Sequence, residues 1–291
     1  MSTLRNPFAH EGAFDEKLQA AFEQNLLGAL LEDVGTGDLT GKLVPEEPRA
    51  KARVIVREEA VLCGAPWFEG IMLAVDQDIE IDWQYAEGDL MAADSVVCTI
   101  EASPRSLLTA ERAALNFLQL LSGVASATRK YVEVVAGTRA KILDTRKTLP
   151  GLRQAQKYAV RVGGGANQRM ALYDGILIKE NHIAAAGGIT AALNAAAALN
   201  AGVTIQVEVE SIAELQEALA AGAVSILLDN FDLDMMREAV RINDGRALLE
   251  ASGGINMQTV RAIAETGVDR VSVGSLTKDV RATDYSLRIV G

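Results

Sequence analysis

The sequence of 291 residues contains few cysteines, histidines and aromatic residues. Cys63 and Cys98 lie far apart and form no CxxC motif, which excludes a disulfide framework or a cysteine zinc site and fits a reduced, cytoplasmic protein. Two histidines, His10 and His182, are too few for a multi-histidine metal site. Aromatic residues make up only 4% of the chain, beside 25 glycines. This composition favours close packing of helices on sheets over an aromatic-rich binding surface.

A surplus of positive charge and a signal peptide are also absent. The 28 Lys and Arg residues face 39 Asp and Glu residues, for a net charge of −11, so nucleic acid is not an expected partner. Residues 1–15 lack the charged-then-apolar pattern of a signal peptide. The uncharged run 183–207 is long enough to raise the question of a membrane span. Because three glycines and two asparagines interrupt this alanine-rich run, we expect a loop, a helix and a strand, and no membrane partner.

The first part of the chain mixes helices with a run of strands, which predicts an α/β sandwich. We place this N-terminal domain over residues 1–120 and expect the C-terminal strand, within 280–291, to join it. Apolar residues recur at helical spacing over residues 105–135, where a break near Gly123 is expected. The other expected helices are 15–31 and 66–75, and the expected strands are 51–57, 79–84 and 96–101.

After residue 138 short apolar strands alternate with helices. This order predicts parallel βα units, so the fold class is α/β, and we assign residues 121–279 to a second, α/β-barrel domain. The expected strands are 141–144, 176–179, 204–208, 225–229, 247–250 and 270–273.

Three consecutive expected strands end in an acidic residue. Glu208, Asp229 and Glu250 follow one another at intervals of 21 residues, and Asp144 and Lys179 close two earlier strands. The carboxyl ends of parallel strands converge on the mouth of a βα barrel, where active sites lie. The alternative is that these residues are ordinary helix caps or loop residues, but their recurrence on consecutive strands favours a functional site.

Positive charge is concentrated in residues 139–179. This segment holds nine basic and two acidic residues, a net charge of +7, whereas the rest of the chain carries −18. A cationic segment in an acidic protein indicates a focused anion site, and both Arg and Lys bind carboxylates and phosphates. We expect Arg139, Lys157 and Arg161 to be surface residues. The bases expected at the barrel mouth are Arg146, Lys147, Arg169 and Lys179.

Glycine-rich loops follow two late strands and precede expected helices. In barrel enzymes the backbone N–H groups of such loops bind phosphate. Nearby carboxylates, here Glu208 and Asp229, bind Mg²⁺ or accept hydrogen bonds from sugar hydroxyls. These features indicate a phosphorylated sugar and a second anionic substrate. A third glycine cluster, 163–165, either covers the anion or turns the chain. The two late loops are Ser252-Gly253-Gly254 and Val273-Gly274-Ser275.

Nine segments of the chain form an ordered set of motifs. They are EDVGTGDLT (32–40), ERAALNFLQLLSG (111–123), DTRKTLPGLR (144–153), GGGANQR (163–169), LIKENH (177–182), VEVE (207–210), LLDN (227–230), EASGGI (250–255) and VSVGS (271–275). Together they strongly resemble one enzyme family, quinolinate phosphoribosyltransferase, also called nicotinate-nucleotide pyrophosphorylase (carboxylating). The resemblance spans most of the chain.

The resemblance implies an N-terminal α/β sandwich and an incomplete, open α/β barrel. It also implies a homodimer, and leaves a higher oligomer open, with each active site at a subunit boundary. The implied reaction converts quinolinate and phosphoribosyl pyrophosphate into nicotinate mononucleotide, pyrophosphate and CO₂ in NAD biosynthesis. Mg²⁺, bound with phosphoribosyl pyrophosphate, is the implied cofactor, and Glu208 and Asp229 would engage the ribose hydroxyls and this metal, directly or through the substrate.

The resemblance also implies roles for individual residues. Arg146, Arg169 and Lys179 would hold the two carboxylates of quinolinate, and Arg112 would reach in from the partner subunit. Lys147 would lie near the reacting centre. The implied catalytic residues are Lys147, Glu208 and Asp229. The residues implied for substrate binding further include Thr145, Gln168 and, for the 5′-phosphate, Ser252, Gly253, Gly254, Val273, Gly274 and Ser275.

One position departs from the family pattern. Many relatives carry His directly before the arginine that matches Arg169, whereas this chain has Gln168. Glutamine donates a hydrogen bond but cannot become cationic. We therefore expect a change in how the carboxylate is held, and no proton transfer at this position.

Three alternatives stay open at this stage. Lys179 ends an apolar strand, as Schiff-base lysines do in barrel aldolases. The protein could instead bind a pyridine dicarboxylate or a sugar phosphate without turnover, or act on a different base, which Gln168 would permit. His182 is expected to be a core histidine with satisfied hydrogen bonds rather than a catalytic base.

Overall fold

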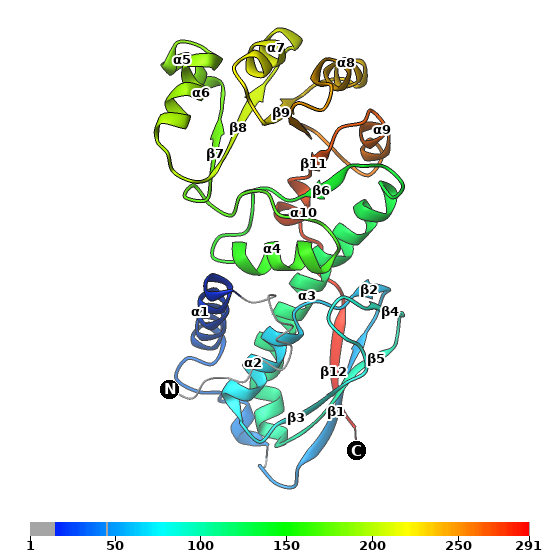
Figure 1. Ribbon diagram of the computed structural model, residues 1–291. Helices are drawn as coiled ribbons and strands as arrows, with labels where there is room; N and C mark the ends of the chain where they lie inside the picture. Colours follow the sequence, from blue (N-terminus) through cyan, green and yellow to red (C-terminus); the bar gives the residue numbers. More distant parts are fainter. Residues whose placement is uncertain (1–14, 45, 291) are drawn as a thin grey trace. The chain divides into compact units, whose positions relative to one another are not determined.

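The computed structural model describes residues 15–44 and 46–290 (Figure 1). His10 and residues 1–14 of the segment examined for a signal pattern lie outside these ranges. The chain forms two compact units. Unit 1 comprises the residues up to Ala127, Leu149–Gly164 and the residues from Asp279 onward, and unit 2 comprises Thr128–Thr148 and Gly165–Lys278.

A four-stranded antiparallel sheet with the order β12-β1-β5-β3 frames unit 1. Alternate residues of β1, Ala52, Val54 and Val56, are fully buried, as a strand with one face on the core requires. The last strand of the chain pairs with β1, with Lys51 opposite Val290. β2 and β4 form a separate antiparallel pair. The strands are β1 (Ala50–Val56), β2 (Ala60–Val61), β3 (Glu80–Trp83), β4 (Leu90–Met91), β5 (Val96–Ala102) and β12 (Tyr285–Val290).

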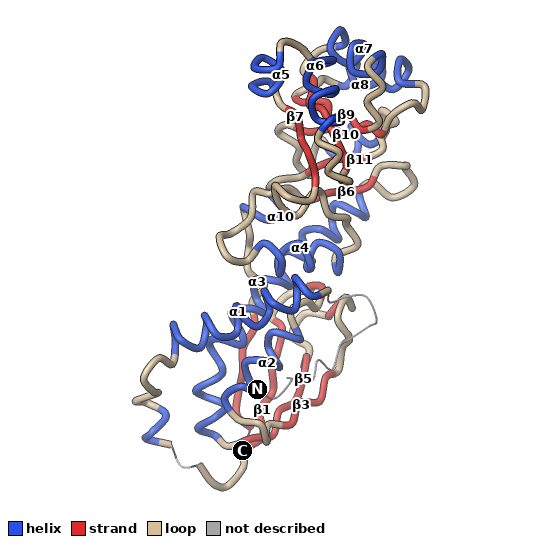
Figure 2. Tube along the Cα trace, turned by 60° about the vertical axis from the view of Figure 1, so that its left-hand side comes forward, coloured by secondary structure: helices blue, strands red, loops and turns tan. Residues whose placement is uncertain are grey.

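Helices α1, α2 and α3 lie on one side of this sheet (Figure 2). The fully buried Trp67 is central to the core, with its ring centroid 5.4 Å from that of Phe22 and 5.4 Å from that of Tyr158. Tyr158 lies on α4, and this packing explains why Leu149–Gly164 belongs to unit 1 and not, as expected, to the barrel. The helices are α1 (Glu16–Asp33), the short 3₁₀ helix η1 (Gly41–Leu43), α2 (Ala65–Val75), α3 (Pro104–Val134) and α4 (Arg153–Val162).

Two sequence-based expectations about unit 1 are wrong. Lys157, expected at the surface, is fully buried on α4. Helix α3 runs through Gly123 without a break. A Cβ at Gly123 would lie 2.2 Å from the carbonyl oxygen of Arg281, so this glycine is needed for the close approach of the chain that leads into β12.

Unit 2 contains a parallel sheet of six strands in the order β6-β11-β10-β9-β8-β7. Because a closed barrel of this type has eight strands and this sheet ends at β6 and β7, the barrel is open. The expected fold class, a sandwich plus an open parallel α/β barrel, is confirmed. The strands are β6 (Lys141–Leu143), β7 (Gly175–Ile178), β8 (Thr204–Val209), β9 (Ser225–Asp229), β10 (Leu248–Ser252) and β11 (Arg270–Ser272).

Helices cover the outer side of the barrel strands (Figure 1). Side chains mark where some of them begin: Asp232 accepts a hydrogen bond from the N–H of Met235 at 2.8 Å before α8. In the described part of the chain, no helix combines the length and apolarity needed to cross a membrane. The helices are α5 (Glu180–Ala186), α6 (Ile189–Ala198), α7 (Ile212–Ala220), α8 (Leu233–Asn243), α9 (Val260–Ala264) and α10 (Ser275–Lys278).

Glu250 does not lie at a strand end, as the sequence pattern predicted. Strand β10 continues to Ser252, which is in register with Asp229, while Glu250 is paired with Leu227. The side chain of Glu250 is buried and accepts a hydrogen bond from Gln206 Nε2 at 2.9 Å. Since β9 lies between β8 and β10, this bond places both side chains inside the barrel.

Candidate active site

Polar residues at the ends of β7, β8 and β9 meet at the mouth of the barrel. Lys179 directly follows β7, and its Nζ lies 2.5 Å from Oε2 of Glu208 on β8. The Lys179 side chain is 47% exposed and that of Glu208 only 10%, so the pair lies where the interior opens to solvent. Asp229 is the last residue of β9. The structure thus brings together three residues that the strand-end pattern singled out.

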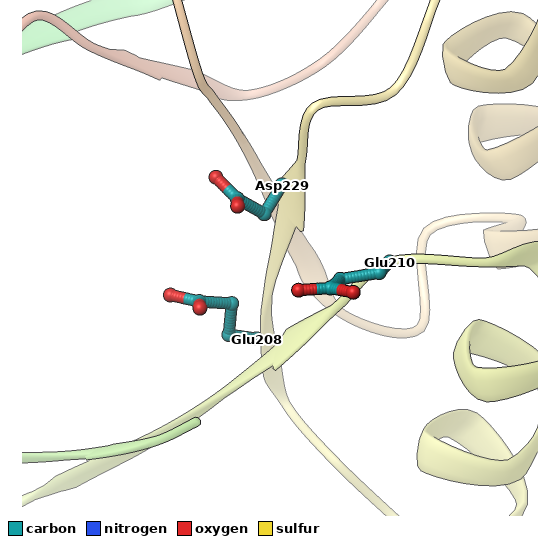
Figure 3. A group of neighbouring side chains, drawn as sticks. All are labelled: Glu208, Glu210 and Asp229. Atoms are coloured by element: carbon teal, nitrogen blue, oxygen red, sulfur yellow. The ribbon is translucent and has the colours of Figure 1, made fainter. Parts of the chain in front are cut away.

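Glu208, Glu210 and Asp229 form a cluster of carboxylates (Figure 3). One oxygen from each side chain lies within 4.8 Å of the others. Partial desolvation and the negative charges of Glu180, Glu214 and the other two cluster members raise the pKa of Glu210. Carboxylate oxygens are the kind of ligand that a hard divalent cation such as Mg²⁺ prefers. The strand-end pattern does not include Glu210, although its spacing of two from Glu208 places both residues on one face of an extended chain.

A groove of about 530 Å³ adjoins this cluster through Lys179, which lines the groove and is paired with Glu208. Arg146 and Arg169 contribute two further positive charges to its lining. Burial and the positive charge of Arg146 lower the pKa of Arg169, against the opposite effect of Asp174. A negatively charged ligand between the two guanidinium groups would relieve their mutual repulsion, so the pair favours an anion. The other lining residues are mostly apolar and include Leu172, Ile176, Leu177, Ile178, Ala192, Ala196 and Leu199.

The glycine loop after β10 is held against the end of β9. Gly253 has φ +100°, and a Cβ there would lie 2.1 Å from Oδ1 of Asn230. Asn230 in turn donates from Nδ2 to Asp229 at 2.8 Å and from its backbone N–H to Ser252 at 3.1 Å. Only glycine allows this approach, so the loop and the carboxylate cluster form one structural unit.

The second glycine loop packs on the segment after β6. A Cβ at Gly274 would contact Cδ of Lys147 at 3.3 Å and Oγ1 of Thr145 at 3.6 Å. Thr277 Oγ1 donates to the carbonyl of Lys147 at 2.8 Å. Val273 is buried, whereas Ser275 at the start of α10 is partly exposed. The structure therefore places Thr145 and Lys147 beside the loop expected to bind phosphate.

The remaining residues considered in the sequence do not all line the groove or join the carboxylate cluster. Arg112 is exposed on α3 in unit 1. Gln168 donates from Nε2 to Gln206 at 2.8 Å, toward the barrel interior. His182 is not a core residue: it is exposed, and its Nδ1 accepts a hydrogen bond from the N–H of Lys179 at 3.1 Å where α5 begins. The 163–165 cluster spans the point where the chain passes between the units, since Gly164 belongs to unit 1 and Gly165 to unit 2.

An open βα barrel with a cationic groove next to a carboxylate cluster is typical of enzymes that act on anionic substrates. Family models identify which family of such enzymes this chain matches. Residues 38–122 and 124–288 match the family models of the N-terminal and C-terminal domains of quinolinate phosphoribosyl transferase. The chain belongs to this family.

Curated relatives and solved structures agree with the family match. The chain is 40% identical over 260 residues to a probable nicotinate-nucleotide pyrophosphorylase [carboxylating] of Bacillus subtilis, covering 89% of this chain and 90% of that protein. It is 42% identical to the nicotinate-nucleotide pyrophosphorylase [carboxylating] of Mycobacterium leprae, covering 89% and 94%. The structure of nicotinate-nucleotide pyrophosphorylase from Francisella tularensis superposes with a TM-score of 0.91 at 43% identity, covering 93% of this chain and 96% of that one.

Proposed function

We propose that this protein transfers the phosphoribosyl group of phosphoribosyl pyrophosphate to quinolinate and decarboxylates the product. Nicotinate mononucleotide, pyrophosphate and CO₂ result, as a step of NAD biosynthesis. Beyond family membership, one observation supports the proposal: Lys179 lines the cationic, apolar-walled groove and is paired with Glu208 of the carboxylate cluster.

The groove suits quinolinate, a flat aromatic ring with two adjacent carboxylates. Arg146, Arg169 and Lys179 bind the two negative charges, while apolar side chains such as Leu177 contact the ring. Arginine adds geometric selectivity because its planar fork bonds a carboxylate through two N–H groups. Nicotinate has one carboxylate fewer and leaves part of this positive charge unneutralised.

The other half of the mouth suits phosphoribosyl pyrophosphate. The loops at Gly253 and Gly274 offer backbone N–H groups to its 5′-phosphate, and Lys147 offers a positive charge near the pyrophosphate. Glu208, Glu210 and Asp229 would hold Mg²⁺, directly or through water, and accept hydrogen bonds from the ribose hydroxyls. When bound, Mg²⁺ would neutralise charge on the leaving pyrophosphate.

The proposed reaction requires little acid–base catalysis by side chains. The quinolinate nitrogen attacks C1 of the ribose and the C1–O bond to pyrophosphate breaks. The pyridinium nitrogen then stabilises the carbanion left when CO₂ departs from the adjacent carbon, and a proton from solvent replaces it. The side chains hold the two reactants in line and neutralise their charge, so the reaction requires no catalytic triad.

A homodimer in which Arg112 completes the partner's groove is part of this proposal, as is a cytoplasmic location. The exposure of Arg112 on α3 supports the dimer, because this residue is open to a second copy. A barrel aldolase using Lys179 is not supported, since both units match domains of the phosphoribosyl transferase family.

A turnover assay tests the proposal. Purified protein is mixed with quinolinate, phosphoribosyl pyrophosphate and Mg²⁺, and nicotinate mononucleotide and CO₂ are followed, with nicotinate in a parallel reaction. Product from quinolinate alone is expected. Product from nicotinate, or none from either substrate with folded protein, would overturn the proposal; the second result would leave a binding protein or an enzyme for another base.

A pair of lysine variants tests the groove charge directly. Lys179→Met removes the lysine that is paired with Glu208 at the end of β7, whereas Lys51→Met removes an exposed lysine of β1 in unit 1 that is paired with Glu101. Only Lys179→Met should raise the KM for quinolinate, by at least tenfold, since a charge-assisted hydrogen bond is lost.

A further inference from the structure

Arg169, which lines the groove, is connected to the barrel interior by a series of side-chain amides. Gln168 Nε2 donates to Gln206 Oε1 at 2.8 Å, and Gln206 Nε2 donates to Glu250 Oε2 at 2.9 Å. At the other end, the backbone N–H of Arg169 donates to Gln168 Oε1 at 2.6 Å. The series therefore runs from a groove residue through two amides to a carboxylate that is only 1% exposed.

The chemistry at its two ends fixes the direction of every hydrogen bond. The N–H of Arg169 can only donate, so Gln168 must turn its oxygen toward it and its NH₂ toward Gln206. Gln206 must then present its oxygen to Gln168 and its NH₂ to residue 250. An acceptor at position 250 completes the series, and Glu250 supplies one.

A second anchor holds the same segment from its backbone. Asp144, fully buried, accepts from the backbone N–H of Gln168 at 2.9 Å and from Asn167 Nδ2 at 2.5 Å. The guanidinium of Arg169 is then directed by its own bond to the carbonyl of Gly175, at 2.8 Å. The backbone on either side of Arg169 is thus held, by Asp144 at Gln168 and by Asp174, which accepts from the N–H groups of Met170 and Ala171 at 2.8 Å.

We propose that Gln206 and Glu250 are positioning residues, which set Arg169 for the carboxylate of quinolinate through the amide of Gln168. The inference rests on the proposed function, and it gives Gln168 a task that needs no positive charge. Glutamine at this position orients the neighbouring arginine, and neither Gln206 nor Glu250 touches the substrate.

The test is the kinetics of Gln206→Leu, which breaks both amide links, in the full-length protein. We expect the KM for quinolinate to rise roughly tenfold, which is the effect of losing one hydrogen bond. The KM for phosphoribosyl pyrophosphate should change less than twofold. Equal changes in both constants, or none, would overturn the proposal. A wild-type protein inactive on quinolinate would instead contradict the proposed function.

A matched control separates positioning from stability. Asn243 in unit 2 is also a buried amide; its side chain bonds the N–H and the carbonyl of Ala247 at 2.9 and 2.8 Å, at the end of α8. Asn243→Leu should lower the urea midpoint as Gln206→Leu does and leave the KM for quinolinate unchanged. If it raises that KM equally, the positioning role is refuted.

Two further variants keep the inference testable if Gln206→Leu folds poorly. Glu250→Gln retains an acceptor and should keep the KM for quinolinate within twofold of wild type, whereas Glu250→Leu should raise it. In a Gln168→Leu background, Glu250→Leu should add no further rise, because the connection is already broken. Independent, multiplicative effects would refute transmission through Gln168.

Discussion

Replacing Gly253 with alanine should disrupt the glycine loop after β10, which we propose binds the 5′-phosphate, through a single methyl group. The residue has φ +100°, and the new Cβ would lie 2.1 Å from Asn230 Oδ1 and 3.0 Å from the Asn230 backbone nitrogen. A side chain in such a strained backbone conformation costs about 1–3 kcal/mol. Displacement of Asn230 would also weaken its hydrogen bonds to Asp229 and Ser252. Each such bond contributes about 0.5–1.5 kcal/mol to the stability of the fold.

The neighbouring glycine provides the matched control. Gly254 has φ +59°, and a Cβ there would meet nothing within 4 Å. Gly254→Ala therefore carries only the cost of a left-handed residue, about 1–2 kcal/mol. We expect Gly253→Ala to lose about 1–3 kcal/mol more than Gly254→Ala, because it adds the steric overlap and the strained hydrogen bonds to Asn230.

Urea unfolding and steady-state kinetics measure the two effects. Gly253→Ala should show the lower unfolding midpoint and a KM for phosphoribosyl pyrophosphate raised at least tenfold, with a smaller change for Gly254→Ala. Equal midpoints and equal KM values for the two variants would refute the reasoning, since the contact with Asn230 would then carry no energy.

Three further predictions concern the groove, the carboxylate cluster and the dimer. Gly175→Ala places a Cβ 3.1 Å from that of Arg169 and should raise the KM for quinolinate three- to tenfold, on the order of one weakened hydrogen bond; an unchanged KM would show that Arg169 adjusts freely. The raised pKa of Glu210 means that this carboxylate takes up its proton at a higher pH than usual, so the Mg²⁺ concentration for half-maximal rate should rise as the pH falls. Glu210→Gln should remove part of this dependence, and an identical pH response would argue against a role in Mg²⁺ binding. Mixing inactive Arg112→Ala and Asp229→Asn proteins should restore activity if Arg112 serves the partner's site; no recovery after verified subunit exchange would exclude that arrangement.

The periodicity of apolar residues was sufficient to predict most of the fold. β1, β5 and the six strands of the barrel lie within one or two residues of their expected ranges, because a buried strand needs an apolar residue at least at every second position. β2 and β4 were missed, since a strand of two residues has no period. Lys157 was misjudged because a charged residue is expected at the surface unless packing, which the sequence does not display, encloses it.

For the candidate site, the strand-end pattern identified site residues correctly only where the sequence predicted the end of the strand correctly. Lys179, Glu208 and Asp229 meet as their positions predicted, since parallel strands present their carboxyl ends at one edge. Glu250 appeared equivalent, but register with β9 carries β10 on to Ser252 and leaves Glu250 inside. Glu210 lies just past β8 and joins the cluster because residues two apart on an extended chain face the same side.

The sequence by itself determined the family, the alternation of strands and helices, and the concentration of positive charge in one segment. These properties are local or ordered along the chain, so they can be read without coordinates. Only the tertiary structure decided that Gln168, Gln206 and Glu250 form one hydrogen-bonded series. Gln206 lies 38 residues from Gln168 and 44 from Glu250. Gln206 and Glu250 meet because the sheet curves and brings the interior faces of β8 and β10 together, and Gln168 joins them because Asp144 holds its backbone at the end of β6.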